Sequence, residues 1–180
     1  ILLSDFNFIP NLVQPLALDI LKKLFKNTGP KFSIIRDQFF TPSEKYYTPH
    51  GINIYINPDG QGDYKCKRST IKHFQAVNPK PNVVFPKFWY ENKIILTFIS
   101  GSSSKQNKLY PKYVKSPAGI GNRLMYLSPP QKMVNILLKF FTSKLINFLL
   151  EITQYTDGQM ASNEFKILNM ISIPLGLPNI

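Results

Sequence analysis

The residues best suited to chemistry in this chain are cations that cluster in its first half. The cluster comprises Lys65, Lys67, Arg68 and Lys72, with His73 beside them. In an extended strand, Lys65 and Lys67 share one face and Arg68 lies on the other, because successive side chains alternate. A two-stranded ribbon can enter the DNA major groove, where arginine reads guanine through two hydrogen bonds and lysine mainly contacts phosphate. The alternative interpretation is a solvated strand edge that lysines protect against aggregation.

A second cationic group is interleaved with tyrosines and follows a Ser-rich segment at residues 100–104. Its members are Lys105, Lys108, Tyr110, Lys112, Tyr113, Lys115 and Arg123. Lysines contact phosphates, and tyrosines can stack on sugars or displaced bases, so we expect this group to bind DNA as well. In the competing interpretation the tyrosines pack on the core with their hydroxyls outward, and the Ser-rich segment is a solvated connector.

The remaining polar residues do not predict a catalytic or metal site. His50, His73 and Cys66 lack the spacing of zinc ligands, and the single cysteine has no recognisable catalytic partner. Three acidic residues are too scattered to indicate a nuclease metal site, namely Asp59, Asp63 and Glu91. We therefore expect no catalytic residue, no metal and no cofactor within this chain.

The elements that must position these residues begin with two helices. Apolar residues at helical spacing predict a helix from Pro15 to Lys26 and a longer one over residues 129–153. Ser128 is expected to cap the longer helix through its hydroxyl, and Pro129 suits its first position. A further short helix is expected to close at Ile173-Pro174.

Strands are expected between these helices. Alternation of isoleucines predicts a strand at residues 52–56 that turns at Asn57-Pro58-Asp59-Gly60 and returns at residues 64–68. Three further strands are predicted at residues 83–85, 94–99 and 123–127. The expected fold is α+β, with an N-terminal helix, a central and mostly antiparallel sheet with a hairpin and long loops, and C-terminal helices.

The charge and hydrophobicity of the chain indicate which kinds of partner it can bind. The 180 residues include 22 Lys and Arg against 10 Asp and Glu, a formal net charge of +12 at pH 7. This balance favours polyanions, although the Asn- and Lys-rich composition of an AT-rich genome would also scatter lysines. The most apolar window, residues 133–150, contains Asn135, Lys139, Lys144 and Asn147, so we expect no transmembrane span. A membrane-surface role of the helix over residues 131–152 is not favoured either, because it carries few basic residues and a strong core stripe.

The start of the chain and its single cysteine bear on its processing and on its cellular compartment. The chain starts at Ile1 without an initiator methionine or a basic leader, so we expect a processed chain or a fragment of a longer one. With Cys66 alone no intramolecular disulfide can form, and a reducing, cytoplasmic compartment is expected.

Several segments occur in a family-like order. Phe32-Ser33-Ile34-Ile35 and Tyr47-Thr48-Pro49-His50-Gly51-Ile52 precede Asn82-Val83-Val84-Phe85-Pro86-Lys87, and a polar loop, a strand, a helix at residues 138–150 and Ile173-Pro174 follow. This order resembles the target-recognition region of N6-adenine DNA methyltransferases of restriction-modification systems, especially those that fuse methylase and nuclease.

The chain departs from that family at the catalytic motifs. The family binds S-adenosylmethionine at a glycine-rich loop that opens a helix, whereas Gly119-Ile120-Gly121 precedes a predicted strand. The family's catalytic tetrapeptide ends in an aromatic that stacks on the flipped adenine, whereas Gln131 follows Ser128-Pro129-Pro130. The resemblance therefore implies that the catalytic domain and S-adenosylmethionine lie outside this chain.

The resemblance implies two parts, a helix linking from a preceding domain at residues 1–30 and a DNA target-recognition domain at residues 31–180. The implied partners are double-stranded DNA and a methyltransferase catalytic domain in the same or a partner chain. This chain would not be catalytic alone. The alternative is a stand-alone basic RNA- or protein-binding module without an enzymatic role.

Overall fold

The computed structural model describes residues 15–26, 33–36, 43–59, 62–78, 83–101, 109–153, 155–157, 160–162 and 168–169. The helices are α1 (Pro15–Lys26), α2 (Ile71–Val77), α3 (Val134–Phe141) and α4 (Lys144–Thr153), with 3-10 turns η2 (Glu44–Tyr46), η3 (Lys87–Tyr90) and η4 (Gln131–Met133). The strands are β1 (Ile52–Pro58), β2 (Tyr64–Ser69), β3 (Lys93–Thr97), β4 (Ile99–Gly101), β5 (Lys112–Val114), β6 (Ala118–Ile120), β7 (Leu124–Leu127), β8 (Tyr155–Asp157) and β9 (Met160–Ser162). The expected α+β class is confirmed.

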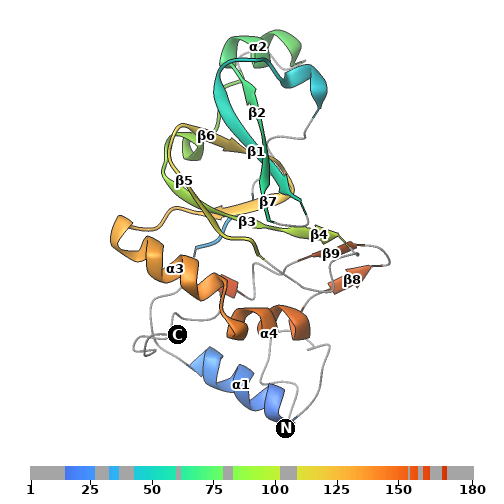
Figure 1. Ribbon diagram of the computed structural model, residues 1–180, viewed down its shortest axis with the longest axis vertical. Coiled ribbons are helices and arrows are strands. Elements are labelled where there is room, and N and C mark those ends of the chain that lie inside the picture. Colours follow the sequence, from blue (N-terminus) through green and yellow to red (C-terminus); the bar gives the residue numbers. More distant parts are fainter. Residues whose placement is uncertain are drawn as a thin grey trace.

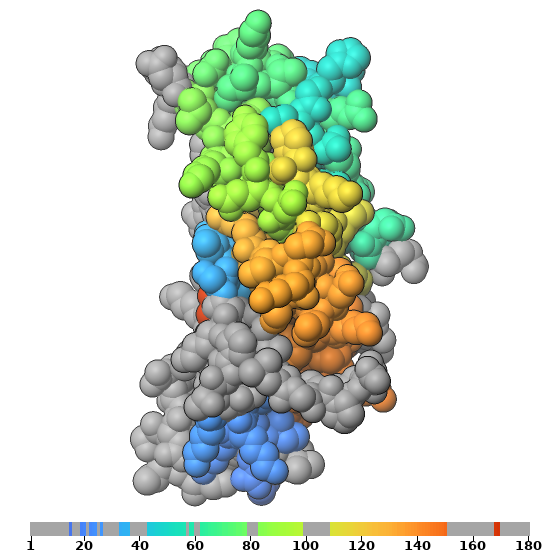
Figure 2. Space-filling model, turned by 90° about the vertical axis from the view of Figure 1, so that its left-hand side faces the viewer, coloured from blue at the N-terminus to red at the C-terminus, as the bar shows by residue number. Residues whose placement is uncertain are grey.

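The described elements stack in tiers along the long axis of the molecule (Figure 1). The first tier holds α2 and a sheet of order β2-β1-β6, and the second is a sheet of order β5-β3-β7. Helices α3 and α4 form the third tier, and α1 lies at the far end (Figure 1). Figure 2 shows the same succession from the side, with α3 in orange between the upper tiers and the blue α1.

The hairpin formed by β1 and β2 follows the alternation of the sequence. The two strands pair antiparallel, with Asn53 opposite Arg68 and Tyr55 opposite Cys66. Its turn is held by Asp59, whose Oδ1 accepts a hydrogen bond from the backbone N of Asp63 at 3.0 Å. Aspartate favours turns for this reason, because its carboxylate bonds to nearby backbone amides. The predicted hairpin is confirmed.

The other edge of β1 pairs with β6 in parallel, unlike the other strand pairs among the described residues. Gly119 at the centre of β6 faces the buried ring of Trp89. A Cβ at Gly119 would lie 2.8 Å from three atoms of that ring, so only glycine lets the strand approach so closely.

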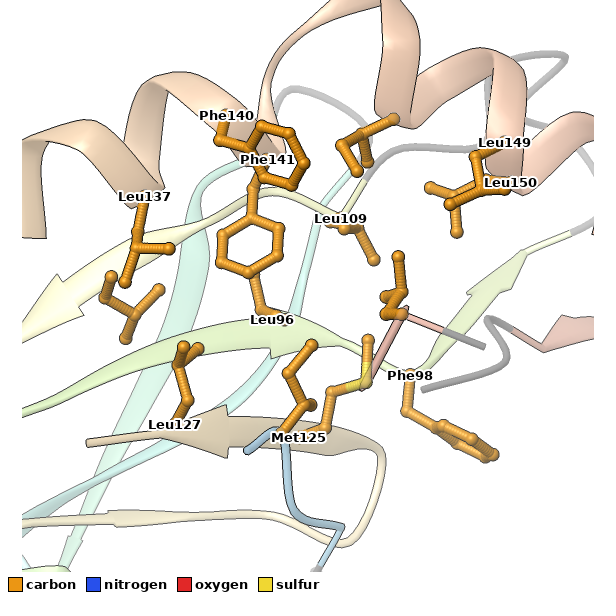
Figure 3. Packing of buried hydrophobic residues seen from close by; sticks show 14 of the residues in the cluster. Leu96, Phe98, Leu109, Met125, Leu127, Leu137, Phe140, Phe141, Leu149 and Leu150 are labelled. Atoms are coloured by element: carbon orange, nitrogen blue, oxygen red, sulfur yellow. The ribbon is translucent and has the colours of Figure 1, made fainter. Parts of the chain in front are cut away.

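Two hydrophobic cores separate the tiers. The upper core lies between the two sheets and is centred on Ile54, Trp89 and Ile95, all fully buried. The lower core lies between the β5-β3-β7 sheet and the helices, where Leu96, Met125 and Leu127 face Phe141 and Leu149 (Figure 3). Strand β3 serves both cores because Ile94 and Leu96 point to one face and Ile95 to the other. Its residues are therefore all buried.

The expected single helix over residues 129–153 is wrong, because the chain breaks between α3 and α4 with a bend of 64°. The Thr142 hydroxyl donates to the backbone carbonyls of Leu138 and Lys139, and the Ser143 hydroxyl accepts from the backbone N of Ile146 at 3.3 Å. The Lys139 carbonyl thus accepts from a side chain, because the backbone N of Ser143 bonds the carbonyl of Phe140 instead. The Ser143 hydroxyl then caps the start of α4.

The expected helix cap at Ser128 is also wrong. Its hydroxyl donates to Glu91 Oε2 at 3.2 Å, and η4 begins only after Pro130. Within the described ranges, no single helix is long and apolar enough to cross a membrane. Only the bent pair of helical stretches at residues 131–141 and 144–150, taken together, has that length and composition.

Three further strand and helix expectations need comment. Residues 83–86 form no strand, because Phe85 packs against Trp89 with ring centroids 4.4 Å apart and η3 follows directly. The strand expected at residues 94–99 divides at Phe98 into β3 and β4. The predicted short helix ending at Ile173-Pro174 lies outside the described residues.

Lys93 at the start of β3 is fully buried. Its ammonium group donates to the backbone carbonyls of Ala118 at 3.0 Å and Trp89 at 3.5 Å, and so ties η3 to β6. Burial lowers the pKa of Lys93 from 10.5 to about 8, although the nearby Glu91 carboxylate opposes the shift.

We expect Lys93 to make stability rise with pH. Between its folded pKa of about 8 and its ordinary 10.5, the unfolded chain binds more protons than the folded one. The free energy of unfolding should therefore increase by on the order of 1–2 kcal/mol between pH 7.5 and 9.5. Urea unfolding at these two pH values measures the free energy of unfolding. The Lys93→Met variant should not show the increase between them. Lys87→Met, which removes an exposed lysine, is the matched control and should keep it.

Candidate nucleic-acid interface

One surface of the hairpin combines hydrogen-bonding and cationic side chains. We call it the polar hairpin face, formed by Asn53 and Tyr55 of β1 and by Tyr64, Cys66 and Arg68 of β2. The expected alternation holds, because Lys65 and Lys67 lie on the opposite side of β2. The Arg68 Nε donates to Asn53 Oδ1 across the strands at 3.3 Å. Both side chains are exposed.

Lys112 reaches the polar hairpin face from β5 in the neighbouring sheet. Its Nζ lies 5.6 Å from the centre of the Tyr55 ring and 5.9 Å from that of Tyr64, within the range of cation–π attraction. The structure thus joins Arg68 from the first predicted cluster with Lys112 from the second. The pairing of β5 with β3, with Lys112 opposite Ile95, fixes this position.

Tyr110 fastens the hairpin to the second sheet. Its backbone carbonyl accepts a hydrogen bond from the Tyr64 hydroxyl at 2.6 Å, and its ring lies so close to Gly62 that a Cβ there would stand 2.7 Å from it. Tyr110 adopts a left-handed backbone conformation, with φ of 45°. Its ring is therefore engaged at the hairpin tip, where it steadies the polar hairpin face.

The surroundings of the polar hairpin face shift the pKa values of Cys66 and of its two tyrosines. Partial burial raises the pKa of the Cys66 thiol, while the charges of Arg68 and Lys112 act to lower it. Burial likewise raises the pKa of Tyr55 and that of Tyr64. The tyrosines therefore stay neutral at physiological pH, and the charge of this face comes from Arg68 and Lys112.

The opposite side of the hairpin is electrostatically different. Lys67 forms an ion pair with Glu44 of η2, and its Nζ lies 4.6 Å from the centre of the Tyr47 ring. Lys65 and Lys72 are exposed, the latter on α2. The carboxylate of Glu44 offsets the charge of Lys67, so this lysine is less available to a phosphate than Lys112.

The remaining predicted residues are dispersed. The Tyr113 hydroxyl donates to Gln131 Oε1 at 2.7 Å and its ring packs on the lower core, away from Lys112. Arg123 is exposed in the turn between β6 and β7, where its carbonyl accepts a hydrogen bond from the backbone N of Phe98 at 3.0 Å. Lys105 and Lys108 lie outside the described residues.

A groove beside the polar hairpin face was not foreseen. It has a volume of about 500 Å³, and its walls include Asn53, Ile71, Phe85, Tyr90 and Pro117. The signal available in the sequence was the run Lys87–Tyr90. In a 3-10 turn residues three apart share a face, so burial of the two central aromatics leaves Lys87 and Tyr90 outward.

The described part of the chain contains no group of three or more His, Cys, Asp or Glu side chains that could hold a metal ion.

The proximity of Lys112 to Cys66 predicts a kinetic effect. Lys112→Ala removes a positive charge that favours the thiolate, so the pKa of Cys66 should rise further and alkylation by iodoacetamide at pH 8 should slow on the order of two- to fivefold. Since Cys66 is the only cysteine, mass spectrometry reports this site alone. Lys139→Ala on α3 should alkylate at the unaltered rate. Equal rates for the two variants would contradict the geometry described for Lys112.

A scan against protein-family models finds no match for this chain, and searches of curated proteins and of solved structures likewise find none.

Proposed function

We propose that this chain contributes the DNA-binding target-recognition domain of a site-specific N6-adenine DNA methyltransferase that uses S-adenosylmethionine, within a restriction-modification system. The supporting observation is the convergence of Arg68 and Lys112, from two separate sheets, on one exposed face with Asn53. The family identification itself comes from the order of segments in the sequence. The catalytic domain, in the same or a partner chain, supplies the cofactor site and the pocket for the target adenine.

Asn53 gives Arg68 a defined role on this face. The Arg68 Nε is engaged by Asn53 Oδ1, which leaves the two terminal nitrogens of the guanidinium for a partner. Two parallel donors match the O6 and N7 acceptors of guanine in the major groove. A guanidinium already held by Asn53 loses less conformational entropy on binding than a free one. Arg68 thus selects a base.

Lys112 contributes differently. An ammonium group is a compact charge without the planar fork of arginine, so it contacts phosphate and fixes the position of the protein on the duplex. Among the described residues Lys112 forms no ion pair of the kind that joins Lys67 to Glu44. We place the domain in the cytoplasm, where its DNA is found and where the free thiol of Cys66 persists in reduced form.

DNA binding by the full chain should weaken steeply with salt, since phosphate contacts release counterions. Fluorescence anisotropy with labelled duplexes at a series of salt concentrations measures the slope of log affinity against log salt. Lys112→Ala should reduce this slope by about one unit, Lys67→Ala by less because Glu44 already offsets its charge, and Lys139→Ala by nothing.

Arg68→Ala should act on sequence preference. In a selection from random duplexes it should relax one base position and cost roughly 1–3 kcal/mol there, while Lys112→Ala weakens all sequences alike. Binding that ignores salt, or tighter binding of double-stranded RNA than of DNA, would contradict the proposal and favour a different binding module.

A further inference from the structure

The groove beside the hairpin adjoins the polar hairpin face directly. Asn53 belongs to both, because its side chain accepts a hydrogen bond from Arg68 and the residue also lines the groove. Ser69 lines the groove too and follows Arg68 in β2. A base bound in the groove and a base read by Arg68 are therefore close enough to belong to adjacent parts of one nucleic-acid strand.

The walls of the groove are mainly apolar, with one large aromatic ring at the surface. Tyr90 is 55% exposed, and the other large hydrophobic residues exposed in the described ranges are the aliphatic Ile35, Val84 and Ile136. Ile71 and Pro117 provide further apolar surface. A flat aromatic ring beside apolar walls suits a flat, weakly polar ligand, because stacking removes both faces from water.

The groove also offers polar recognition. Among the described residues, the amide nitrogen of Asn53 has no hydrogen-bond partner, and its Oδ1 keeps a second lone pair beyond the bond from Arg68. A side-chain amide can thus donate to a ring nitrogen and accept from an exocyclic amine on the edge of a base.

The charges around the groove favour an anionic ligand. Arg68 lies on one side, and the exposed Lys72 follows the lining residue Ile71 in α2. The nearest carboxylate in sequence to Tyr90, that of Glu91, instead accepts a hydrogen bond from Ser128 and belongs to a separate cavity with Lys87. Two exposed cations thus adjoin lining residues of the groove in sequence, and Tyr90 supplies an aromatic wall.

We infer that this groove binds one unstacked nucleobase, with Tyr90 as the stacking platform and Asn53 at the edge of the base, while Arg68 contacts the same strand. This inference rests on the proposed DNA-binding function and extends it from paired to locally unpaired DNA. The domain then favours duplexes in which a base next to its binding site is already out of the stack, since the cost of unstacking has been removed.

The test uses the full chain and two labelled duplexes, one fully matched and one with a single bulged 2-aminopurine. The bulged duplex should bind more tightly, and its 2-aminopurine fluorescence should be quenched as the base stacks. Tyr90→Ala should weaken binding of the bulged duplex about 5- to 150-fold and abolish the quenching, with little change for the matched duplex.

Two control variants separate stacking from other effects. Tyr90→Phe keeps the ring and should retain both the affinity and the quenching. Ile136→Ala truncates a comparably exposed residue on α3 and should change neither. Because the Tyr90 side chain is exposed, its truncation leaves the core intact, which circular dichroism can verify.

The outcomes distinguish the groove from the wider function. Salt-dependent binding of the matched duplex, without preference for the bulge and without an effect of Tyr90→Ala, overturns the groove inference alone. Equal weakening of both duplexes by Tyr90→Ala also overturns it, because the ring then acts as a general contact. Failure to bind either duplex overturns the proposed function together with the inference.

Discussion

The burial of Trp89 against β6 is the contact on which the position of the hairpin depends. The indole packs on Phe85 on one side and meets the bare backbone of Gly119 on another, which brings η3 and the β2-β1-β6 sheet together. Lys93 reinforces the junction by binding the carbonyls of Trp89 and Ala118. Since β1 pairs with β6, whatever holds β6 also sets where the polar hairpin face points.

The same contact shapes the groove. In η3 the burial of Phe88 and Trp89 turns Tyr90 outward, and β6 begins immediately after Pro117 on the other wall. A buried lysine at this junction is costly, because an ammonium group loses its hydration. Two backbone carbonyls and the nearby Glu91 offset part of that cost, and burial still leaves the pKa of Lys93 below its ordinary value.

The sequence predicted what depends on local periodicity. The isoleucines of β1 and the turn at Asp59 specified the hairpin, and the apolar stripe of residues 15–26 specified α1, because both signals lie within a few residues. The apolar stripe over residues 129–153 predicted one helix where the structure has two. The helical spacing continues on both sides of the break at Thr142 and Ser143, so the stripe does not reveal the break. The short strands β5 and β6 were not predicted, because three residues are too few to show an alternating pattern.

The candidate interface depends on contacts between residues far apart in the sequence. The net charge alone could therefore not predict which lysines form it. Lys67, Lys93 and Lys112 contribute equally to the net charge, yet one is paired with Glu44, one is buried under two carbonyls and one is exposed over Tyr55 and Tyr64. Only the last can meet a phosphate without first breaking an ion pair or unburying an ammonium group. The fold therefore decides which of these equal formal charges stays exposed to solvent. The exposed one is Lys112, at the edge where β5 approaches the hairpin, on the face that also carries the Arg68 side chain bonded to Asn53.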